Sequence, residues 1–122
     1  MNTRVLLIED EPNIAEAIRF LLSRDGWQVM VLPTGDGAMA QILAARPALV
    51  ILDLMLPGQS GLDILRQIRA SPDVPDLPVM MLTAKGQERD REAAVAAGVS
   101  NFMTKPFDNS QMRASVRELL GG

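Results

Sequence analysis

The sequence predicts an α/β protein, a doubly wound three-layer sandwich whose five-stranded parallel sheet has the strand order 2-1-3-4-5. Short apolar runs without polar alternation are typical of strands buried on both faces of a parallel sheet. Five such runs alternate with amphipathic segments, and right-handed crossovers then place helices on both faces. No residues remain for a second domain, so we expect one domain over residues 1–122.

The first strand and the first helix are marked by an apolar run and a proline. Residues 5–8 form the run, and Pro12 suits the first turn of a helix because its missing N–H would be unpaired there anyway. Gly26 is expected to end this helix. The apolar residues at helical spacing are Ile14, Ala17, Ile18, Leu21 and Leu22.

The second strand is expected at residues 28–32 and the third at residues 49–52. Between them, a cluster of helix breakers at residues 33–35 precedes a helix from about residue 36 to residue 45. Pro47 separates this helix from the third strand.

A loop at residues 54–61 follows the third strand, and its proline and glycines allow tight turning close to a ligand. Ser60, with Asp63 three positions later, predicts a capping box at the start of the third helix. The proline-rich residues 71–78 then lead into the fourth strand at residues 79–82.

The last two helices flank a very short strand. A charged helix is expected at residues 87–97, ending at Gly98. Residues 101–103 predict a fifth strand that is short enough for the edge of a sheet. Asp108 and Gln111 are expected to cap the final helix.

The absence of cysteine and histidine limits the chemistry that the chain can perform. Without cysteine there are no disulfides, thiolate nucleophiles or cysteine-ligated zinc. Without histidine there is no Ser-His-Asp or Cys-His catalysis, no histidine-ligated metal and no phosphohistidine carrier within the chain. Any chemistry must use carboxylates, hydroxyls, amines or a hard metal ion.

Charge and hydropathy argue against two kinds of partner. A net charge of -3 with 3% aromatic residues argues against nucleic acid, because nucleic-acid binders usually present a basic face with stacking rings. No apolar stretch approaches the roughly 18 residues of a membrane span, and the start of the chain lacks a secretory hydrophobic region. We therefore expect a cytoplasmic protein that binds neither nucleic acid nor membrane directly.

Polar residues suited to binding phosphate or metal follow four of the apolar runs. They are Glu9 and Asp10 after the first run, Asp53 after the third, Thr83 after the fourth and Lys105 after the fifth. In an open parallel sheet, ligands bind beyond the carboxyl ends of the strands, where the strand order reverses. The first and third strands lie side by side at that point, so we expect their three carboxylates to lie together.

Three carboxylates at close range repel one another, so the fold needs a cation among them, either Lys105 or a divalent metal. Oxygen ligands alone, with the backbone carbonyl of Met55 as a neutral addition, suit Mg²⁺, with Mn²⁺ as the alternative ion. Beside such an ion Asp53 can attack phosphorus and form an aspartyl phosphate. Lys105, Thr83 and backbone N–H groups can then stabilise the negative charge on the transferred group.

Each of these residues also has an ordinary explanation when it is taken alone. Acids at residues 9–11 are favoured near a helix N-terminus, an Asp after a strand is commonly a loop residue, and Thr83 could cap the fourth helix. Lys105 could be a surface charge, and Phe102 is most simply a core or edge-strand aromatic. Together, however, four strand ends supply complementary groups where the topology predicts a site, which favours the functional interpretation.

Ordered blocks of sequence give the chain a resemblance to a known family. The blocks are residues 5–11, 52–61, 82–84 and 102–107. Through them the chain resembles, over essentially its whole length, the receiver domain of response regulators in two-component signalling. The resemblance implies a flavodoxin-like fold, a regulatory rather than an enzymatic role, and a phosphoryl group received from a phosphohistidine of a sensor histidine kinase or a phosphotransfer protein.

The resemblance also implies a set of metal ligands. Asp53 would be the phosphoacceptor, Asp10 a direct Mg²⁺ ligand, Glu9 a metal-site acid that acts directly or through water, and Met55 would lend its carbonyl. The family more commonly has Asp at the position of Glu9, and Gln59-Ser60 replaces a frequent Met-Asp pair. Metal geometry and the capping of the third helix are therefore expected to differ in detail.

The resemblance also implies a conformational switch that responds to phosphorylation. Thr83 and Lys105 match the positions that contact the incoming phosphoryl group, and Phe102 matches the aromatic residue that turns inward when Thr83 is drawn toward the phosphate. The peptide bond before Pro106 is usually cis in the family. Lys85 and Met55 flank the site and are expected to tune the lifetime of the phosphoryl group.

The output implied by the resemblance is a changed surface on the fourth helix, the fifth strand and the fifth helix. This surface would contact a downstream protein or an attached output domain, or would form a homodimer. Its residues would be Glu88, Arg89, Arg91, Glu92 and the exposed side of residues 109–118.

Two other classes of function compete with this interpretation. A phosphatase of the haloacid dehalogenase type also uses an Asp nucleophile at a strand end, but that family has a second Asp two residues later, where this chain has Met55. A phosphorylation-independent interaction module or small-molecule binder would leave the acidic cluster unexplained, and no glycine-rich phosphate-binding motif follows the first strand.

Overall fold

The computed structural model describes residues 2–84 and 88–121, which form five strands alternating with five helices. The expectations that fall on Lys85 and Gln87, and on the side chain of Glu88, lie outside the described residues. The elements are β1 (Arg4–Ile8), α1 (Pro12–Arg24), β2 (Gln28–Leu32), α2 (Ala38–Ala45), β3 (Leu49–Asp53), α3 (Gly61–Ala70), β4 (Val79–Ala84), α4 (Glu88–Ala96), β5 (Asn101–Lys105) and α5 (Asn109–Leu119).

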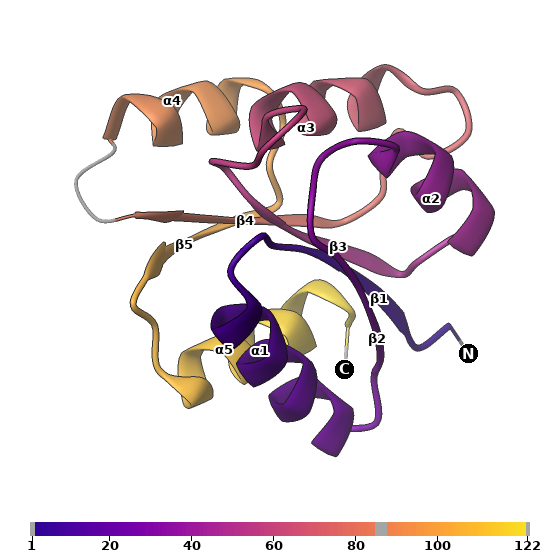
Figure 1. Ribbon diagram of the computed structural model, residues 1–122. Coiled ribbons are helices and arrows are strands. Elements are labelled where there is room, and N and C mark those ends of the chain that lie inside the picture. The colour runs from indigo at the N-terminus through magenta and orange to yellow at the C-terminus, as the bar shows by residue number, and fades with distance from the viewer. Residues whose placement is uncertain (1, 85–87, 122) are drawn as a thin grey trace.

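The strands form one parallel sheet in the order β2-β1-β3-β4-β5, as the sequence predicts. Figure 1 shows α2, α3 and α4 on one face of this sheet and α1 and α5 on the other. The order reverses between β1 and β3, which pair directly, with Ile8 opposite Leu52. The residues that follow these two strands therefore leave the sheet side by side.

The core consists of two apolar layers, one on each side of the sheet. Leu6 and Ile8 pack with α2, α3 and α4, whereas Val5 and Leu7 pack with α1 and α5. All four side chains are almost fully buried. Burial of a Leu, Ile or Val side chain contributes roughly 1.5–3 kcal/mol to stability, which explains why these strands have no polar alternation.

One hydrogen bond of each predicted capping box is present, at the start of α3 and at the start of α5. The Ser60 hydroxyl accepts a hydrogen bond from the Asp63 N–H at 3.2 Å, and the Asp108 carboxylate accepts one from the Gln111 N–H at 2.7 Å. Pro12 occupies the first turn of α1, which has no side-chain cap. Each cap satisfies a backbone donor that the helix itself leaves unpaired.

Three predicted boundaries are wrong by two residues. The fifth strand is longer than expected, because pairing with β4 continues until Lys105 lies opposite Ala84. For the same reason β4 continues beyond residue 82. The second helix begins at Ala38 rather than at residue 36, since Gly37 has a left-handed backbone (φ 73°) that no helix can include.

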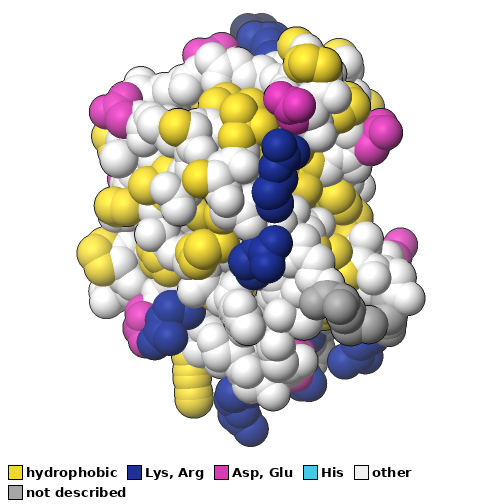
Figure 2. All heavy atoms as spheres, turned by 90° about the vertical axis from the view of Figure 1, so that its right-hand side faces the viewer, with side chains coloured by type: hydrophobic (Ala, Val, Ile, Leu, Met, Phe, Trp, Pro, Cys, Tyr) yellow, Lys and Arg dark blue, Asp and Glu magenta, His cyan; other side chains and the backbone are white. Residues whose placement is uncertain are grey.

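The amino ends of the strands lie opposite the predicted site. Figure 2 shows the face on the right of Figure 1, where the chain enters β1, with Lys and Arg side chains along its middle among hydrophobic ones. At this amino-terminal edge of the sheet, Arg4 donates hydrogen bonds to the Ala45 and Arg46 carbonyls at 2.7 and 3.1 Å, which anchors the end of α2. None of the helices described is long and apolar enough to cross a membrane.

Candidate acidic phosphoryl and metal site

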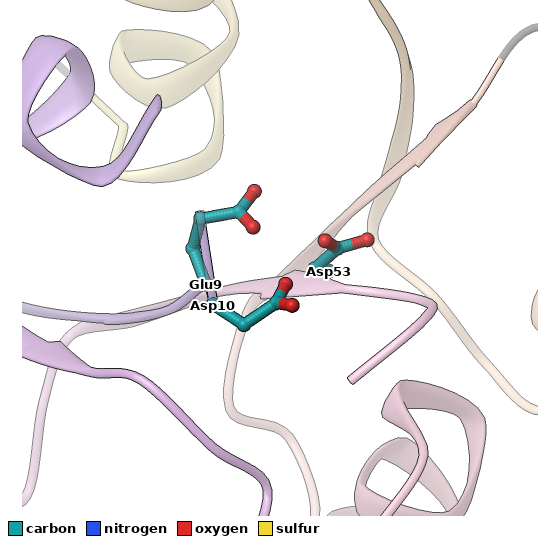
Figure 3. Close-up of side chains that lie close together, drawn as sticks. All are labelled: Glu9, Asp10 and Asp53. Carbon is teal, nitrogen blue, oxygen red and sulfur yellow. The ribbon is translucent and has the colours of Figure 1, made fainter. Parts of the chain in front are cut away.

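The carboxyl ends of β1 and β3 bring together the three acids that the sequence singles out. Glu9 and Asp10 follow β1, and Asp53 is the last residue of β3. One carboxylate oxygen from each lies within 4.8 Å of the others. Figure 3 shows the three side chains around a common space beyond the strand ends. Glu9 and Asp53 are buried, while Asp10 is exposed, so the cluster has one open side.

Lys105 supplies a positive charge to this cluster. Its Nζ atom lies 2.8 Å from Glu9 Oε1 and 3.0 Å from Asp53 Oδ2. The lysine is the last residue of β5, and the peptide bond that joins it to Pro106 is cis, as the resemblance implies. Burial alone would lower the pKa of Lys105, but the two ion pairs outweigh this effect and raise it.

Glu9 is the most deeply buried acid of the cluster, and its environment favours the protonated form. Burial raises its pKa to about 7, partly opposed by Lys105 and reinforced by the nearby Asp53. Glu9 Oε2 accepts a hydrogen bond from the Glu11 N–H at 3.1 Å. Oε1 is buried and accepts no well-directed hydrogen bond from the described residues, although Lys105 lies within ion-pair distance.

Asp53 is held at the end of its strand by local contacts. Its Oδ1 atom accepts a hydrogen bond from the Met55 N–H at 3.2 Å, and Oδ2 faces Lys105. The backbone of Gly61, at the start of α3, lies so close that a Cβ atom there would be 2.3 Å from the Asp53 carbonyl oxygen. The carboxylate therefore has a defined position with two different partners.

The donor set fits a hard divalent cation. Three carboxylates that can contribute one oxygen each within a few ångströms suit Mg²⁺ or Mn²⁺, which prefer oxygen ligands. The buried Glu9 Oε1 has only the Lys105 ion pair and no well-directed donor among the described residues, so it can accept a further positive partner. A cation would also offset the mutual repulsion of the three acids, of which Lys105 neutralises one charge.

The structure places the predicted switch residues on the two strands next to the cluster. Thr83 lies on β4 and is buried, as part of the strand that pairs with β3. Phe102 lies on β5 opposite Met81, and its ring is partly buried against the core. The guanidinium group of Arg91 on α4 lies 5.7 Å from the centre of that ring, a cation–π contact that the sequence gives no reason to expect.

Two clefts flank the start of α1, and one of them is lined by acids of the cluster. One, of about 460 Å³, is lined by Glu9 and Asp10 together with Pro12 and Val31. The other, of about 430 Å³, is mainly apolar and runs beside Lys105. Its other lining residues are Asn13, Ile14, Ala17, Ala84, Pro106, Phe107 and Asn109. The cluster is therefore accessible to a ligand or to a partner's side chain.

Some supporting residues of the site were not anticipated. The sequence places Gly61 in a loop whose glycines allow tight turning close to a ligand, but it does not show that the missing side chain lets α3 approach the Asp53 backbone. The sequence signal was present, since a glycine at the first position of a helix is a poor helix former and needs another reason to be there. The close approach itself depends on the tertiary fold and cannot be seen in the sequence.

Comparison with known sequences identifies the family. A model of the response regulator receiver domain matches residues 5–117. The probable transcriptional regulatory protein TcrX of Mycobacterium tuberculosis is 40% identical over 116 residues, covering 95% of this chain and 49% of that protein. The phosphate regulon transcriptional regulatory protein PhoB of Escherichia coli is 35% identical over 120 residues, covering 98% and 52%. The chain spans about half the length of these curated relatives.

Solved structures agree with this result. The receiver domain of a signal transduction histidine kinase from Syntrophus aciditrophicus superimposes with a TM-score of 0.91 at 30% identity, covering 98% of this chain and 91% of that one. The BeF3-activated N-terminal receiver domain of Klebsiella pneumoniae RstA gives 0.90 at 28% identity, covering 98% and 99%. The chain belongs to the response regulator receiver domain family.

Proposed function

We propose that this chain is a single receiver domain over residues 1–122 that acts in the cytoplasm as a phosphorylation-dependent switch. The observation that supports this most is the shared Lys105, whose ammonium group contacts both the buried Asp53 and the buried Glu9 while Asp10 completes the acidic cluster. Phosphoryl transfer to Asp requires a nucleophilic carboxylate, acidic residues that bind a metal ion, and a positively charged group.

The transfer can be written with its bonds in balance. An Asp53 carboxylate oxygen attacks the phosphorus of a phosphohistidine, a P–O bond forms and the P–N bond to the donor's imidazole breaks. The electron pair of that bond returns to the imidazole nitrogen, which takes up a proton. The donor would be a sensor histidine kinase or a phosphotransfer protein. The chain has no histidine, so the phosphohistidine must come from outside it.

Glu9, Asp10, Asp53 and the backbone carbonyl of Met55 would hold Mg²⁺, or Mn²⁺ in its place. The ion would neutralise part of the charge on the phosphoryl oxygens. Lys105 would leave the Asp53 carboxylate and pair with a phosphoryl oxygen, and it is already within 3.0 Å of the attacking group. The chain would act on no other substrate, so it takes part only in its own phosphorylation and dephosphorylation.

The conformational change would be transmitted from Thr83 to Phe102 and then to the surface of α4, β5 and α5. Thr83 would donate a hydrogen bond to the phosphoryl group and Phe102 would turn inward. On α4, the side chains of Arg89, Arg91 and Glu92 are exposed to solvent. The two arginines give this surface positive charge. The partner would be a downstream protein, an attached output domain or a second copy of the domain.

An attached output domain is supported by the relatives, because TcrX and PhoB are named as transcriptional regulatory proteins and are about twice as long as this match. Contact with DNA would then belong to that further domain. The receiver domain itself would bind no nucleic acid, which agrees with its net charge of -3.

Intact-mass spectrometry with a small phosphodonor tests the proposal. With acetyl phosphate and Mg²⁺, we expect one added phosphoryl group on the wild-type chain and none on Asp53→Asn, which keeps the size of the side chain but loses the nucleophilic charge. Asp73→Asn, an exposed acid in the loop before β4, is the matched control and should react like the wild type. No adduct with any donor would instead favour the interaction module.

A further inference from the structure

The loop that follows Asp53 is held at its tip by a second loop, from between β2 and α2. The carbonyl oxygen of Pro57 accepts two hydrogen bonds from this second loop. One comes from the Gly35 N–H at 3.1 Å and the other from the Thr34 hydroxyl at 3.0 Å. The Thr34 hydroxyl in turn accepts a hydrogen bond from the Asp36 N–H at 3.2 Å, so both its donor and its acceptor positions are used.

Close packing accompanies these hydrogen bonds. A Cβ atom at Gly35 would lie 2.0 Å from the carbonyl oxygen of Gln59, which is a backbone atom and cannot rotate away. On the other loop, a Cβ atom at Gly58 would lie 2.4 Å from the Asp36 carboxylate. Each loop therefore has a glycine where the other approaches it, which is the usual reason for glycine at a backbone contact.

The base of the loop after Asp53 is fixed separately. The Leu54 N–H donates to the Leu82 carbonyl at 2.9 Å, and the Gly61 N–H donates to the Leu54 carbonyl at 3.0 Å, which closes residues 54–61 on themselves. Within this closed loop, Met55 has a side chain that is 67% exposed and so gives little anchorage of its own, while Leu56 packs against the core. The contact of Pro57 with Thr34 and Gly35 adds a further constraint at the tip of the loop.

We propose that Thr34 and Gly35 are positioning residues for the acidic site. By holding Pro57, they fix the loop that begins at Asp53 and contains Met55, and so set the affinity of the site for a divalent cation. This inference rests on the proposed function only in that the same loop would hold the metal used for phosphoryl transfer. It assigns a role to the β2–α2 loop, which contributes no group to the acidic cluster.

Thr34→Val tests the inference, because valine has nearly the same shape and lacks the hydroxyl. A net hydrogen bond is worth about 1 kcal/mol, so the affinity for Mg²⁺ measured by calorimetry should fall about fivefold. Thr34→Ser keeps the hydroxyl and should bind Mg²⁺ as the wild type does. Thr3→Val, just before the amino end of β1, is the matched control, and Gly35→Ala should weaken Mg²⁺ binding more than Thr34→Val.

The readouts separate positioning from a purely structural role. Urea unfolding is measured for each variant alongside Mg²⁺ affinity, at temperatures where all are folded. Loss of stability in Thr34→Val with unchanged Mg²⁺ affinity would overturn the inference, as would a wild-type chain that binds no Mg²⁺. A wild-type chain that accepts no phosphoryl group, combined with weakened Mg²⁺ binding in Thr34→Val, would reject the proposed function and leave the positioning role supported.

Discussion

Gly61→Ala should destabilise the protein by about 3 kcal/mol and impair phosphorylation of Asp53 in the molecules that remain folded. The added Cβ atom would lie 2.3 Å from the Asp53 carbonyl oxygen and 3.0 Å from the Leu54 Cα atom. Both are backbone atoms at the end of a central strand, so relief requires movement of α3 or of the strand end. Urea unfolding gives the stability change, and intact mass after treatment with phosphodonor and Mg²⁺ gives the phosphorylated fraction.

The sign of this effect distinguishes tertiary contact from helix propensity. Gly61 is the first residue of α3, and without the close contact alanine would stabilise the helix by up to about 1 kcal/mol. Gly26→Ala is the matched control, since that glycine has open space around it and a φ of 95°. It should cost about 1–2 kcal/mol through backbone strain and leave phosphorylation unchanged. A Gly61→Ala protein as stable and as reactive as the wild type would contradict the described geometry.

Metal-free stability should fall by about 3 kcal/mol as pH rises from 4.5 to 7, because of Glu9. The pKa of Glu9 is raised by burial from 4.5 to about 7 in the folded protein. Between these values the folded state holds a proton that the unfolded state has lost, so the protonated form contributes stability that is fully present below pH 4.5 and lost by about pH 7. The chain has no histidine that would titrate in the same range.

Glu9→Gln removes this titration while keeping the size of the side chain. In EDTA, the difference in unfolding free energy between the wild type and Glu9→Gln should change by about 3 kcal/mol across this range. Mg²⁺ competes with the proton for the carboxylate, so the stabilisation by Mg²⁺ should increase with pH in the wild type. Parallel pH profiles for the two proteins in EDTA would show that Glu9 is already ionised at pH 5.

The fold could be predicted because buried parallel strands impose a simple pattern on the sequence. Each strand needs apolar residues on both faces, and each helix needs one apolar stripe, so the alternation and the crossover rule define the order 2-1-3-4-5. The same pattern does not define the residues at which the strands and helices end. The pattern could not show that β5 pairs as far as Lys105, because that pairing depends on β4, a distant segment.

The candidate site was predictable at the level of which residues meet. Glu9, Asp10 and Asp53 follow strands that are neighbours in this topology, and the structure brings them within 4.8 Å. The sequence did not reveal how the residues are supported. The sequence offers Lys105 as a cation for the cluster, but its simultaneous contact with Glu9 and Asp53 depends on side-chain direction, which no local pattern encodes. The contact of Thr34 with Pro57 depends in the same way on loop conformation.

Hydrogen exchange on the phosphorylated and unphosphorylated chain tests the switch most directly. We expect addition of a phosphoryl group at Asp53, with Mg²⁺ present, to change amide protection in the loop after Asp53 and also in α4, β5 and α5, and to leave α2 unchanged. Asp53→Asn treated in the same way should show no change. Stoichiometric phosphorylation that alters exchange only next to Asp53, and nowhere in α4, β5 or α5, would contradict the proposal that this domain is a switch.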